Sequence, residues 1–330
     1  MKITGISNAN IALIKYWGKR DSKLFLPYNN SISLTLNGLN ATTTVEFGDY
    51  AKDVFILDGQ EIKEGKELEK LIRHLNLIRK IAGVSEKTKI VSKNNFPKAA
   101  GLASSASGFA AFTLAATKAA GMHLDSKELS IISRQGSGSS ARSCLGGFVE
   151  WTKGEKQDGT DSYAKQIVPI DHWPEFRMII AIVSTKTKKV SSRVGMAQTV
   201  KTSPMYSVWL NTVENDLQNM RKGIESKDFS LVGETAESNC LKMHSTMLTT
   251  HPAIIYWMPA TLEIIHSVRA WREEELESYF TIDAGPQVKV ICLDKQVPEI
   301  KKRLQSLNGV KKVIICEPGQ GPELIKEHLF

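Results

Sequence analysis

The sequence predicts an α+β protein in two parts, and three patterns predict this class. In residues 1–50, short runs of β-favouring residues alternate with turn residues, which is typical of an antiparallel sheet. Residues 65–83 carry apolar side chains at helical spacing. Residues 279–316 follow the order strand, turn, strand, helix, strand, which suits a ferredoxin-like half. We therefore divide the chain into an N-terminal part, 1–185, and a C-terminal part, 186–330.

The composition is that of an ordinary globular protein. The 330 residues are 42% hydrophobic and 24% charged, which is enough for a substantial core. The sequence has no run of about 18 apolar residues and no signal-peptide pattern at its start, so we expect a cytoplasmic protein with no membrane partner. The four cysteines lack CxxC or Cys/His spacing, which indicates reduced packing residues and argues against a disulfide framework and a zinc site.

The net charge of +8 raises the question of nucleic acid. The lysines are dispersed, and no basic stripe alternates with aromatic residues, so we expect no nucleic-acid partner. Local basic clusters beside polar loops suit a small polyanionic substrate equally well, because such charge steers and binds phosphates.

In the N-terminal part we expect strands separated by turns, with three helices. The turns PYNN and NGLN separate the first strands, and Gly83 ends the first helix. The expected strands are 9–17, 31–36, 42–47, 54–59 with its turn, 88–96, 148–151 and 176–185. The expected helices are 65–83, a small-residue helix that ends before Gly121, and 126–136.

The C-terminal part is expected to begin with helices and to end with strands. The expected helices are 204–228, 228–248, 252–275 and 297–307, and the strands are 279–283, 287–293 and 311–316. His244 lies between Met243 and Met247, so we interpret it as a packed or hydrogen-bonded histidine and not as a catalytic group.

Residues 96–121 contain the strongest candidate for a ligand site. From Gly101 to Gly108 nearly all side chains are Gly, Ala or Ser, so backbone amides can approach a ligand closely. A helix follows, and the amides at its start carry a partial positive charge that favours phosphate. A buried alanine-rich helix with a serine-rich cap is an equally good interpretation of this stretch alone. Neither GxxxxGK[ST] nor GxGxxG is present.

Three further stretches are candidates for binding or catalysis. Residues 136–148 place Arg142, with its planar fork for a carboxylate or phosphate, among Gly and Ser, although composition alone favours a flexible surface loop. Residues 186–196 form a basic stretch with hydroxyls. Asp283 ends an apolar strand before a Gly-Pro turn, where it could be catalytic or could simply cap the turn.

Four of these stretches resemble the signatures of a known family, in the same order. PKAAGLASSASG (97–108) resembles the phosphate-binding motif of the GHMP kinase superfamily. SNANIALIKYWGKRD (7–21), SRQGSGSSARSCLGGFVEW (133–151) and FTIDAGP (280–286) are similar to signatures of the mevalonate diphosphate decarboxylases. The resemblance implies a GHMP-kinase-like fold, with a ribosomal-protein-S5-domain-2-like N-terminal half that binds ATP and a ferredoxin-like C-terminal half.

The resemblance also implies an activity. It is the ATP-dependent decarboxylation of mevalonate 5-diphosphate to isopentenyl diphosphate, with Mg²⁺ on the ATP phosphates, in a cytoplasmic homodimer. A related mevalonate or phosphomevalonate kinase, or a decarboxylase of the monophosphate, stays open as an alternative. A nonenzymatic phosphate or RNA binder on the same frame is disfavoured, because Asp283 would then be a negative charge in a polyanion site.

The residues that match the family positions follow from the same resemblance. The implied catalytic residues are Asp283, Arg142 and Lys15. The implied substrate contacts are Tyr16, Lys19, Ser137, Ser139, Arg142, Ser192 and Arg193. The implied ATP contacts are Ser92, Pro97, Gly101, Leu102, Ala103, Ser104, Ser105 and Ser107, with Ser105 also as the metal ligand. Lys98 and Gln287 depart from the usual family pattern.

Overall fold

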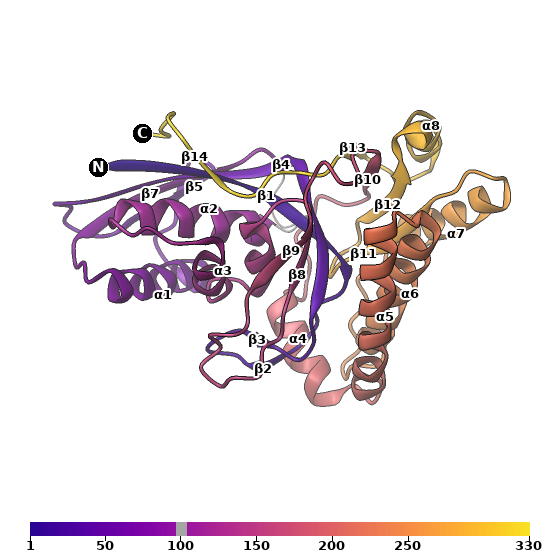
Figure 1. Cartoon of the computed structure of the whole chain (residues 1–330), viewed down its shortest axis with the longest axis horizontal. Coiled ribbons are helices and arrows are strands. Elements are labelled where there is room, and N and C mark those ends of the chain that lie inside the picture. The colour runs from indigo at the N-terminus through magenta and orange to yellow at the C-terminus, as the bar shows by residue number, and fades with distance from the viewer. Residues whose placement is uncertain (97–103) are drawn as a thin grey trace.

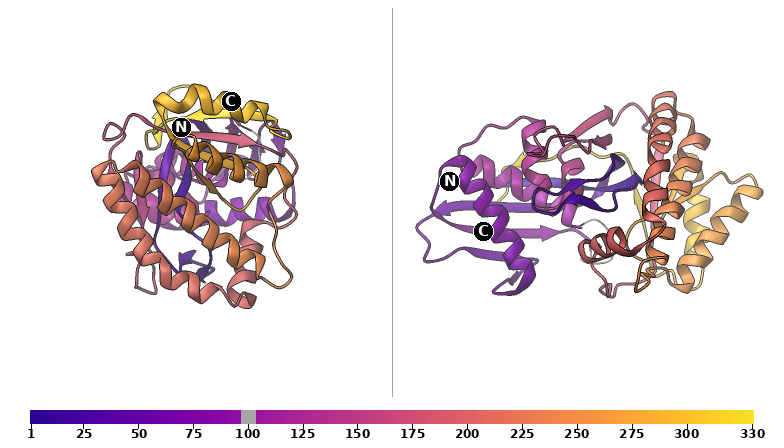
Figure 2. Two further views of the ribbon diagram at one scale, coloured as in Figure 1. Left: turned by 90° about the vertical axis from the view of Figure 1, so that its right-hand side faces the viewer. Right: turned by 90° about the horizontal axis from the view of Figure 1, so that it is seen from below.

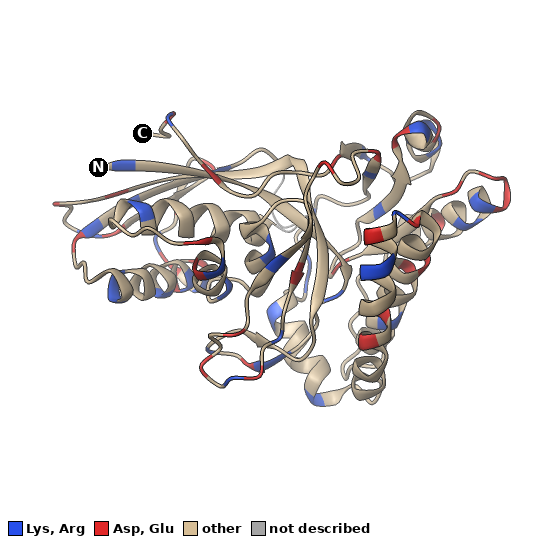
Figure 3. Ribbon diagram, viewed as in Figure 1, with Lys and Arg blue, Asp and Glu red and all other residues tan. Residues whose placement is uncertain are grey.

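A computed structural model describes residues 1–96 and 104–330, and Figure 1 shows its two larger sheets with their helices. The two sheets lie in the two parts of the chain, which are side by side in Figure 1 and in the right-hand view of Figure 2. Lys and Arg are distributed over both parts (Figure 3). Within the described ranges, no helix is both long enough and apolar enough to cross a membrane.

The first sheet has eight strands. Its main path runs β14-β1-β4-β7-β5-β6, and β8 and β9 extend it from β4. All its pairs are antiparallel except β5 with β7. The strands are β1 (Lys2–Ile14), β4 (Ser31–Gly48), β5 (Val54–Leu57), β6 (Gln60–Glu61), β7 (Lys87–Asn94), β8 (Phe148–Trp151), β9 (Ala164–Val168) and β14 (Glu323–Ile325).

The predicted NGLN turn is wrong, because β4 is one continuous strand of 18 residues. The residues on both sides of NGLN pair with β1 in the same direction, so they cannot form a hairpin with each other. Between the pairs Asn8↔Asn40 and Ala9↔Leu36 the register shifts, and Gly38 takes a φ of +91° that glycine tolerates. The NGLN stretch is therefore an irregularity within one strand.

Helices cover one face of the first sheet (Figures 1 and 2). They are α1 (Gly65–Ala82), α2 (Ser104–Ala119) and α3 (Ser126–Arg134). Gly83 ends α1 in the left-handed conformation, as predicted. The N-cap of α3 is Asp125, which forms a capping box with Glu128.

The stretch after α3, for which composition alone favours a flexible surface loop, contains a buried 3₁₀ helix, η1 (Gly138–Cys144). Its Ser140 hydroxyl bonds to the hydroxyl and the carbonyl of Ser133 at 2.9 and 2.6 Å, so α3 fixes it. Burial of these short polar side chains is possible because each finds a partner within the fold.

The second sheet has the order β11-β12-β10-β13 and is antiparallel throughout. Its strands are β10 (Phe176–Ile182), β11 (Tyr279–Ile282), β12 (Val288–Leu293) and β13 (Lys312–Cys316). The helices of this part are α4 (Ser192–Thr202), α5 (Tyr206–Ser226), α6 (Phe229–Leu248), α7 (Pro259–Glu273) and α8 (Val297–Ser306), with a short η2 (Asp294–Gln296). These elements confirm the order strand, turn, strand, helix, strand at the C-terminal end.

Helix α4 and a small hairpin lie at the border between the two parts. The basic stretch 186–196 runs into α4, whose N-cap is Ser191. The Ser191 side chain accepts a hydrogen bond from the amide of Val194. The hairpin consists of β2 (Lys19–Asp21) and β3 (Leu26–Pro27), and it contacts α4.

The chain crosses between the two sheets twice. It passes from β9 to β10, and it returns from β13 to β14, which pairs with β1. The return segment is bonded to β4, because the Asn37 amide donates to the Glu317 carbonyl at 2.9 Å and the Gly319 amide donates to the Thr35 carbonyl at 2.8 Å. The division of the chain at residue 185 stays a prediction. Strand β10, which ends before this position, pairs within the second sheet.

Candidate active site

A cleft of about 700 Å³ lies between the two parts of the chain. Strand β1 leads into it, as do the starts of α2 and α4, the helix η1 and the end of β11. The predicted site residues that line it are Lys15, Tyr16, Lys19, Ser104, Ser105, Ser137, Ser139, Arg142, Ser192, Arg193 and Asp283. Stretches that are far apart in the sequence therefore meet at one place.

The remaining predicted site residues are not part of this lining. Pro97, Gly101, Leu102 and Ala103 lie outside the described residues, as does Lys98. Ser107 is fully buried, and its hydroxyl donates to the Ser104 carbonyl at 3.5 Å. The helical turn directs this hydroxyl inward, which the sequence did not indicate.

Asp283 lies between two buried lysines. Its Oδ1 accepts a hydrogen bond from Lys15 Nζ at 2.8 Å, and its Oδ2 lies 3.4 Å from Lys289 Nζ. Burial alone would raise the pKa of the Asp283 carboxyl, but the two ammonium groups outweigh burial and keep this pKa well below its usual value. The carboxylate is therefore ionised at any pH at which the protein would work.

The end of β1 that carries Lys15 is fixed by buried polar groups. The Lys15 amide donates to Asn239 Oδ1 at 2.8 Å, and the Lys15 carbonyl accepts from Asn29 Nδ2 at 2.8 Å. Asn239 Nδ2 donates to Asp216 Oδ2 at 2.8 Å, and Lys242 Nζ lies 2.6 Å from the same oxygen. Helices α5 and α6 thus position the strand end that reaches Asp283.

Arg142 is buried and held from two sides. Its Nε donates to Asn10 Oδ1 at 3.1 Å, and its Nη1 donates to Ser31 Oγ at 2.6 Å. Burial lowers the pKa of Arg142 to about 10, so the guanidinium stays charged at neutral pH. The side chain lines the cleft. Its hydrogen bonds to the described residues use Nε and Nη1 and leave Nη2 available. Asn10, which we did not predict as a site residue, aligns it.

Three cations surround the ring of Phe25. Lys19 Nζ lies 4.3 Å from the ring centroid, and the guanidinium carbons of Arg193 and Arg73 lie 4.9 and 5.3 Å from it. Burial and then the neighbouring cations, Arg193 first, lower the pKa of Lys19 to about 8. Such an accumulation of positive charge favours a ligand with several negative charges.

Lys188 is a further cation of the cleft that the sequence indicated only as part of a basic stretch. Its Nζ donates to Ser192 Oγ at 2.8 Å and to the Ala284 carbonyl at 2.7 Å. Burial lowers the pKa of Lys188 to about 8, although the charge of Asp283 opposes this shift. Lys188 therefore joins the start of α4 to the turn after Asp283.

Hydroxyl groups form another part of the cleft lining. Ser137 Oγ donates to Ser105 Oγ at 3.3 Å and lies 3.3 Å from Ser139 Oγ. The Tyr16 ring packs edge-on against Trp151 at 4.8 Å, and its hydroxyl has no hydrogen-bond partner among the described residues. Burial raises the pKa of Tyr16, so this hydroxyl stays a donor.

A smaller pocket of about 280 Å³ adjoins the cleft and shares Glu67, Lys70, Ser104 and Ser105 with it. Its walls are largely apolar and include Leu57, Leu71, Ile90, Phe109 and Phe112. Ser92, the remaining predicted ATP contact, lines this pocket, and its hydroxyl lies 2.9 Å from that of Thr43. An apolar pocket with a few hydroxyls suits a flat heterocycle.

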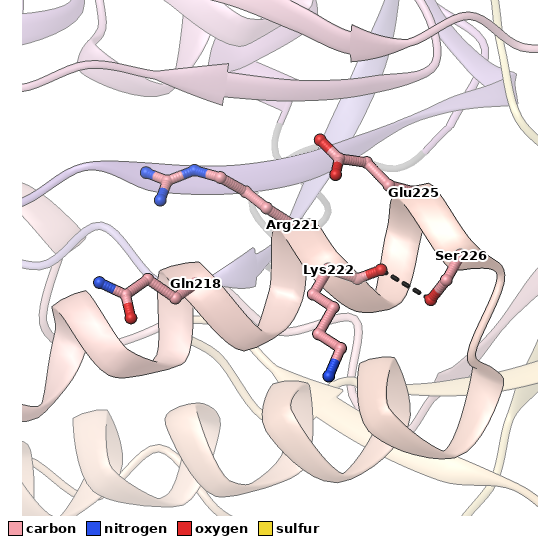
Figure 4. A pocket seen from close by; sticks show the side chains of 5 residues that line it. All are labelled: Gln218, Arg221, Lys222, Glu225 and Ser226. Carbon is pink, nitrogen blue, oxygen red and sulfur yellow. Dashed lines mark hydrogen bonds between the residues drawn. The ribbon is translucent and has the colours of Figure 1, made fainter.

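A surface depression on α5 is unrelated to these residues. Figure 4 shows its five lining residues, Gln218, Arg221, Lys222, Glu225 and Ser226. None of them was predicted as a site residue, and Arg221 is paired with Glu150 at 2.6 Å.

Gln287, the departure behind Asp283, has a structural contact. Its Oε1 accepts a hydrogen bond from the Val183 amide at 2.6 Å, and its Nε2 donates to the Ser184 carbonyl. Gln287 thus connects the turn after Asp283 to the end of β10.

His244 is a buried, packed histidine. Its Nε2 lies 3.2 Å from the Ile282 carbonyl oxygen.

Fold and cleft together define an enzyme of the GHMP-kinase fold class. Two family models match the chain: the diphosphomevalonate decarboxylase-like N-terminal domain over residues 7–164, and the mevalonate 5-diphosphate decarboxylase C-terminal domain over residues 178–307. The chain therefore belongs to the diphosphomevalonate decarboxylase family.

Individual relatives agree with this assignment. The diphosphomevalonate decarboxylase of Homo sapiens is 38% identical, over 98% of this chain and 94% of the human protein. That of Candida albicans is 37% identical over 97% of both chains. The structure of MDDEF in complex with MVAPP, AMPPCP and magnesium is 41% identical, with a TM-score of 0.92 over 99% of both chains. The mevalonate diphosphate decarboxylase structure from Staphylococcus aureus is 39% identical, with a TM-score of 0.91 over 98% of both chains.

Proposed function

We propose that this chain catalyses the ATP-dependent decarboxylation of mevalonate 5-diphosphate to isopentenyl diphosphate, with release of carbon dioxide, phosphate and ADP. The main support is the Asp283 carboxylate, which is ionised between Lys15 and Lys289 beside a cleft lined by cations and hydroxyls. In a protein that only binds phosphates, a carboxylate in this position would repel the ligand. The human and Candida albicans relatives are both named as diphosphomevalonate decarboxylases, which supports the same activity.

The diphosphate is proposed to bind at the cation cluster around Phe25. Lys19 and Arg193 supply the charge there, and Ser192 and Tyr16 supply hydroxyl donors. The carboxylate of the substrate is proposed to bind at Arg142, beside Ser137 and Ser139. This arrangement directs the middle of the substrate toward Asp283.

ATP is proposed to bind with its nucleoside in the smaller pocket and its phosphates toward the cleft. Ser104 and Ser105 line both spaces, so a ligand that fills both must pass them. The neighbour structure with AMPPCP supports this assignment for the family.

Mg²⁺ is proposed to accompany the ATP phosphates, and the available residues fit this role. The described residues contain no group of three or more His, Cys, Asp or Glu that could hold a metal ion. Mg²⁺ commonly needs only one or two protein ligands when phosphates and water complete its shell, and the exposed Ser105 hydroxyl could be one of them. The bound ion would neutralise phosphate charge during phosphoryl transfer.

The residues of the chain then account for the two chemical steps. Asp283 orients the C3 hydroxyl, which attacks the γ-phosphate of ATP, and the carboxylate accepts the hydroxyl proton late, when the new O–P bond has made that proton acidic. Departure of phosphate leaves positive character at C3, which the Asp283 carboxylate faces. Loss of the C1 carboxylate as carbon dioxide supplies the electron pair of the double bond. Arg142 and the cation cluster around Phe25 hold the two ends of the substrate, so that the reacting groups stay aligned.

The test measures ADP and carbon dioxide together, with mevalonate, its monophosphate and its diphosphate as separate substrates. We expect both products in equal amounts from the diphosphate. ADP without carbon dioxide from any of the three would instead support the kinase alternative. Carbon dioxide from the monophosphate would support the related decarboxylase.

A homodimer and a cytoplasmic location are also part of the proposal, and they rest on the family resemblance. Sedimentation of the purified protein tests the dimer, and localisation of the tagged protein in its own cell tests the compartment.

A further inference from the structure

Lys289 is a lysine in the centre of a sheet. It lies in β12, where it pairs with Thr281 of β11 on one side and Ile180 of β10 on the other. Its side chain is 1% exposed, although the adjacent Val288 and Val290 are core residues. A buried ammonium group is unfavourable unless a negative charge pairs with it, so this lysine needs an explanation.

The face on which Lys289 lies directs it toward Asp283. Side chains alternate along a strand, so Val288 and Val290 point to one face while Lys289 and Ile291 point to the other. That second face packs against β1, because the Thr281 hydroxyl lies 3.5 Å from the Ala12 carbonyl. Lys289 Nζ lies 3.4 Å from Asp283 Oδ2 and 3.4 Å from the Gln287 carbonyl.

Asp283 has cations on two sides, and they differ in their access to the cleft. Lys15, Lys188 and Arg142 line the cleft, where anionic substrates would compete with Asp283 for their charge. Lys289 does not line it and is covered by the sheet. A ligand in the cleft would therefore leave the interaction between Lys289 and Asp283 intact.

Within residues 1–96 and 104–330, the other titratable groups that face Asp283 supply no charge. His244 and Cys240 face it from α6, and both are buried. Burial lowers the pKa of His244 to about 3, and burial raises the pKa of Cys240, so both are neutral at physiological pH. Lys289 is thus a charge behind Asp283 that the substrate does not reach.

We propose that Lys289 is a positioning residue of the active site, which holds the Asp283 carboxylate ionised and directed into the cleft when anionic substrates occupy the other cations. This inference rests on the proposed function of Asp283. In a loaded cleft, the carboxylate would lie near a triphosphate, a diphosphate and a second carboxylate. These negative charges favour protonation of Asp283, and a protonated Asp283 loses the charge that the reaction requires.

The test is a double-mutant cycle on kcat with Lys289→Met and Asp283→Asn. Methionine matches lysine in length and lacks its charge. We expect Lys289→Met to lower kcat by about 10-fold or more while the KM of both substrates changes by about 2-fold or less, because Lys289 touches neither. In the Asp283→Asn background, Lys289→Met should cause no further loss, since its effect passes through Asp283. A purely structural role would lower kcat by the same factor in both backgrounds.

A matched control is Lys312→Met, the same substitution at an exposed position of β13 in the same sheet. We expect its kcat to stay within about 2-fold of the wild type in both backgrounds. A normal kcat for Lys289→Met, or equal losses in the two backgrounds, overturns the proposal.

A second cycle needs no substrate and separates this proposal from the proposed function. Thermal unfolding is measured for the same four proteins. Asp283→Asn leaves Lys15 and Lys289 buried without their anion and should lower Tm, and adding Lys289→Met should restore part of the loss. If Lys289→Met lowers Tm as much in the Asp283→Asn background as in the wild type, the charge coupling is absent and the proposal is overturned, whatever reaction the enzyme catalyses. If the Tm cycle shows the coupling but no ATP-dependent carbon dioxide release is found, the proposed function fails, and the positioning role in that reaction fails with it.

Discussion

The ammonium group of Lys15 lies 2.8 Å from Oδ1 of Asp283, although 268 residues separate the two in the chain. Lys15 follows the last residue of β1 in the first sheet, and Asp283 follows the last residue of β11 in the second. Because each residue comes from a different part of the molecule, neither part alone contains the pair. The reaction proposed for the cleft therefore requires both.

Replacement of Asp283 by asparagine should abolish the chemistry while the substrate still binds. Asparagine keeps the shape of the side chain but removes the charge that orients the C3 hydroxyl, accepts its proton and faces the developing positive charge. We expect ADP and carbon dioxide production to fall together by about 10³-fold or more, equivalent to roughly 4 kcal/mol of transition-state stabilisation. Single-turnover assays check this, and equilibrium binding of mevalonate 5-diphosphate serves as the control. Normal ADP formation without carbon dioxide would show that Asp283 acts only after phosphorylation.

The same variant should also be less stable. From the sequence alone we expect its folding to be little changed, but the structure shows two lysines that are each 1% exposed beside this carboxylate. Removal of one partner from a buried ion pair typically costs about 3–5 kcal/mol, and less is expected here because the Asp283 side chain is 25% exposed. Activity must therefore be measured well below the Tm of the variant.

Arg142→Lys should be damaging although the positive charge is kept. The guanidinium uses Nε for Asn10 and Nη1 for Ser31, which leaves Nη2 for the substrate. A lysine cannot make these contacts from one nitrogen at the same time in the same geometry. We expect a loss of about 2–5 kcal/mol in kcat/KM for the diphosphate substrate, measured by steady-state kinetics. Near-normal turnover would remove Arg142 from the site.

A bulky residue at position 105 should prevent nucleotide binding. Ser105 is exposed and lines both the cleft and the adjoining pocket, so phenylalanine there would occupy the passage between them without disturbing the core. We expect Ser105→Phe to weaken ATP binding by about 100-fold or more, measured by calorimetry. Ser105→Ala is the matched control, because it removes the hydroxyl but adds no volume and should bind ATP within about 10-fold of the wild type. Normal ATP affinity and turnover of Ser105→Phe would place the nucleotide elsewhere.

The kcat/KM for the diphosphate should decrease at alkaline pH. Burial lowers the pKa of Lys19 and of Lys188 to about 8, and only their protonated forms attract a polyanion. The attraction is therefore complete below about pH 7 and is lost as the pH rises through about 8, where half of each group is neutral. Lys19→Arg keeps its charge throughout this range and should flatten the decrease if Lys19 is the titrating group. A profile that stays level to about pH 9.5 would contradict the prediction.

Much of the fold could be predicted because its elements leave local patterns. The helical spacing of α1, α5, α6 and α8 and the final strand order are confirmed, since each depends on an apolar face that the sequence shows directly. The helix predicted over 252–275 begins only at Pro259, as α7, because proline suits the first turn of a helix. The continuous β4 and the buried η1 could not be predicted in this way. Both depend on contacts with distant segments, β1 for the former and α3 for the latter.

The residues of the candidate site could be predicted where the family pattern marks them. The residues that hold those side chains in place could not. Lys289 went unnoticed because a lysine in a strand usually indicates a solvated face, and only the folded chain shows which carboxylate pairs with it. Asn10 was missed for a similar reason, since its role is to align Arg142 and not to contact a ligand. The inward hydroxyl of Ser107 depends on the helical phase of α2, which a run of small residues does not fix.

The two crossings of the chain between the sheets limit how the molecule can move. Domains joined by a single linker can rotate freely about it, but two connections leave only bending about the line that joins them. One of the two connections, near Glu317 and Gly319, is itself bonded to β4, so it resists bending. The cleft should therefore adapt to ligands of different length mainly through segments at its rim, such as the start of α4.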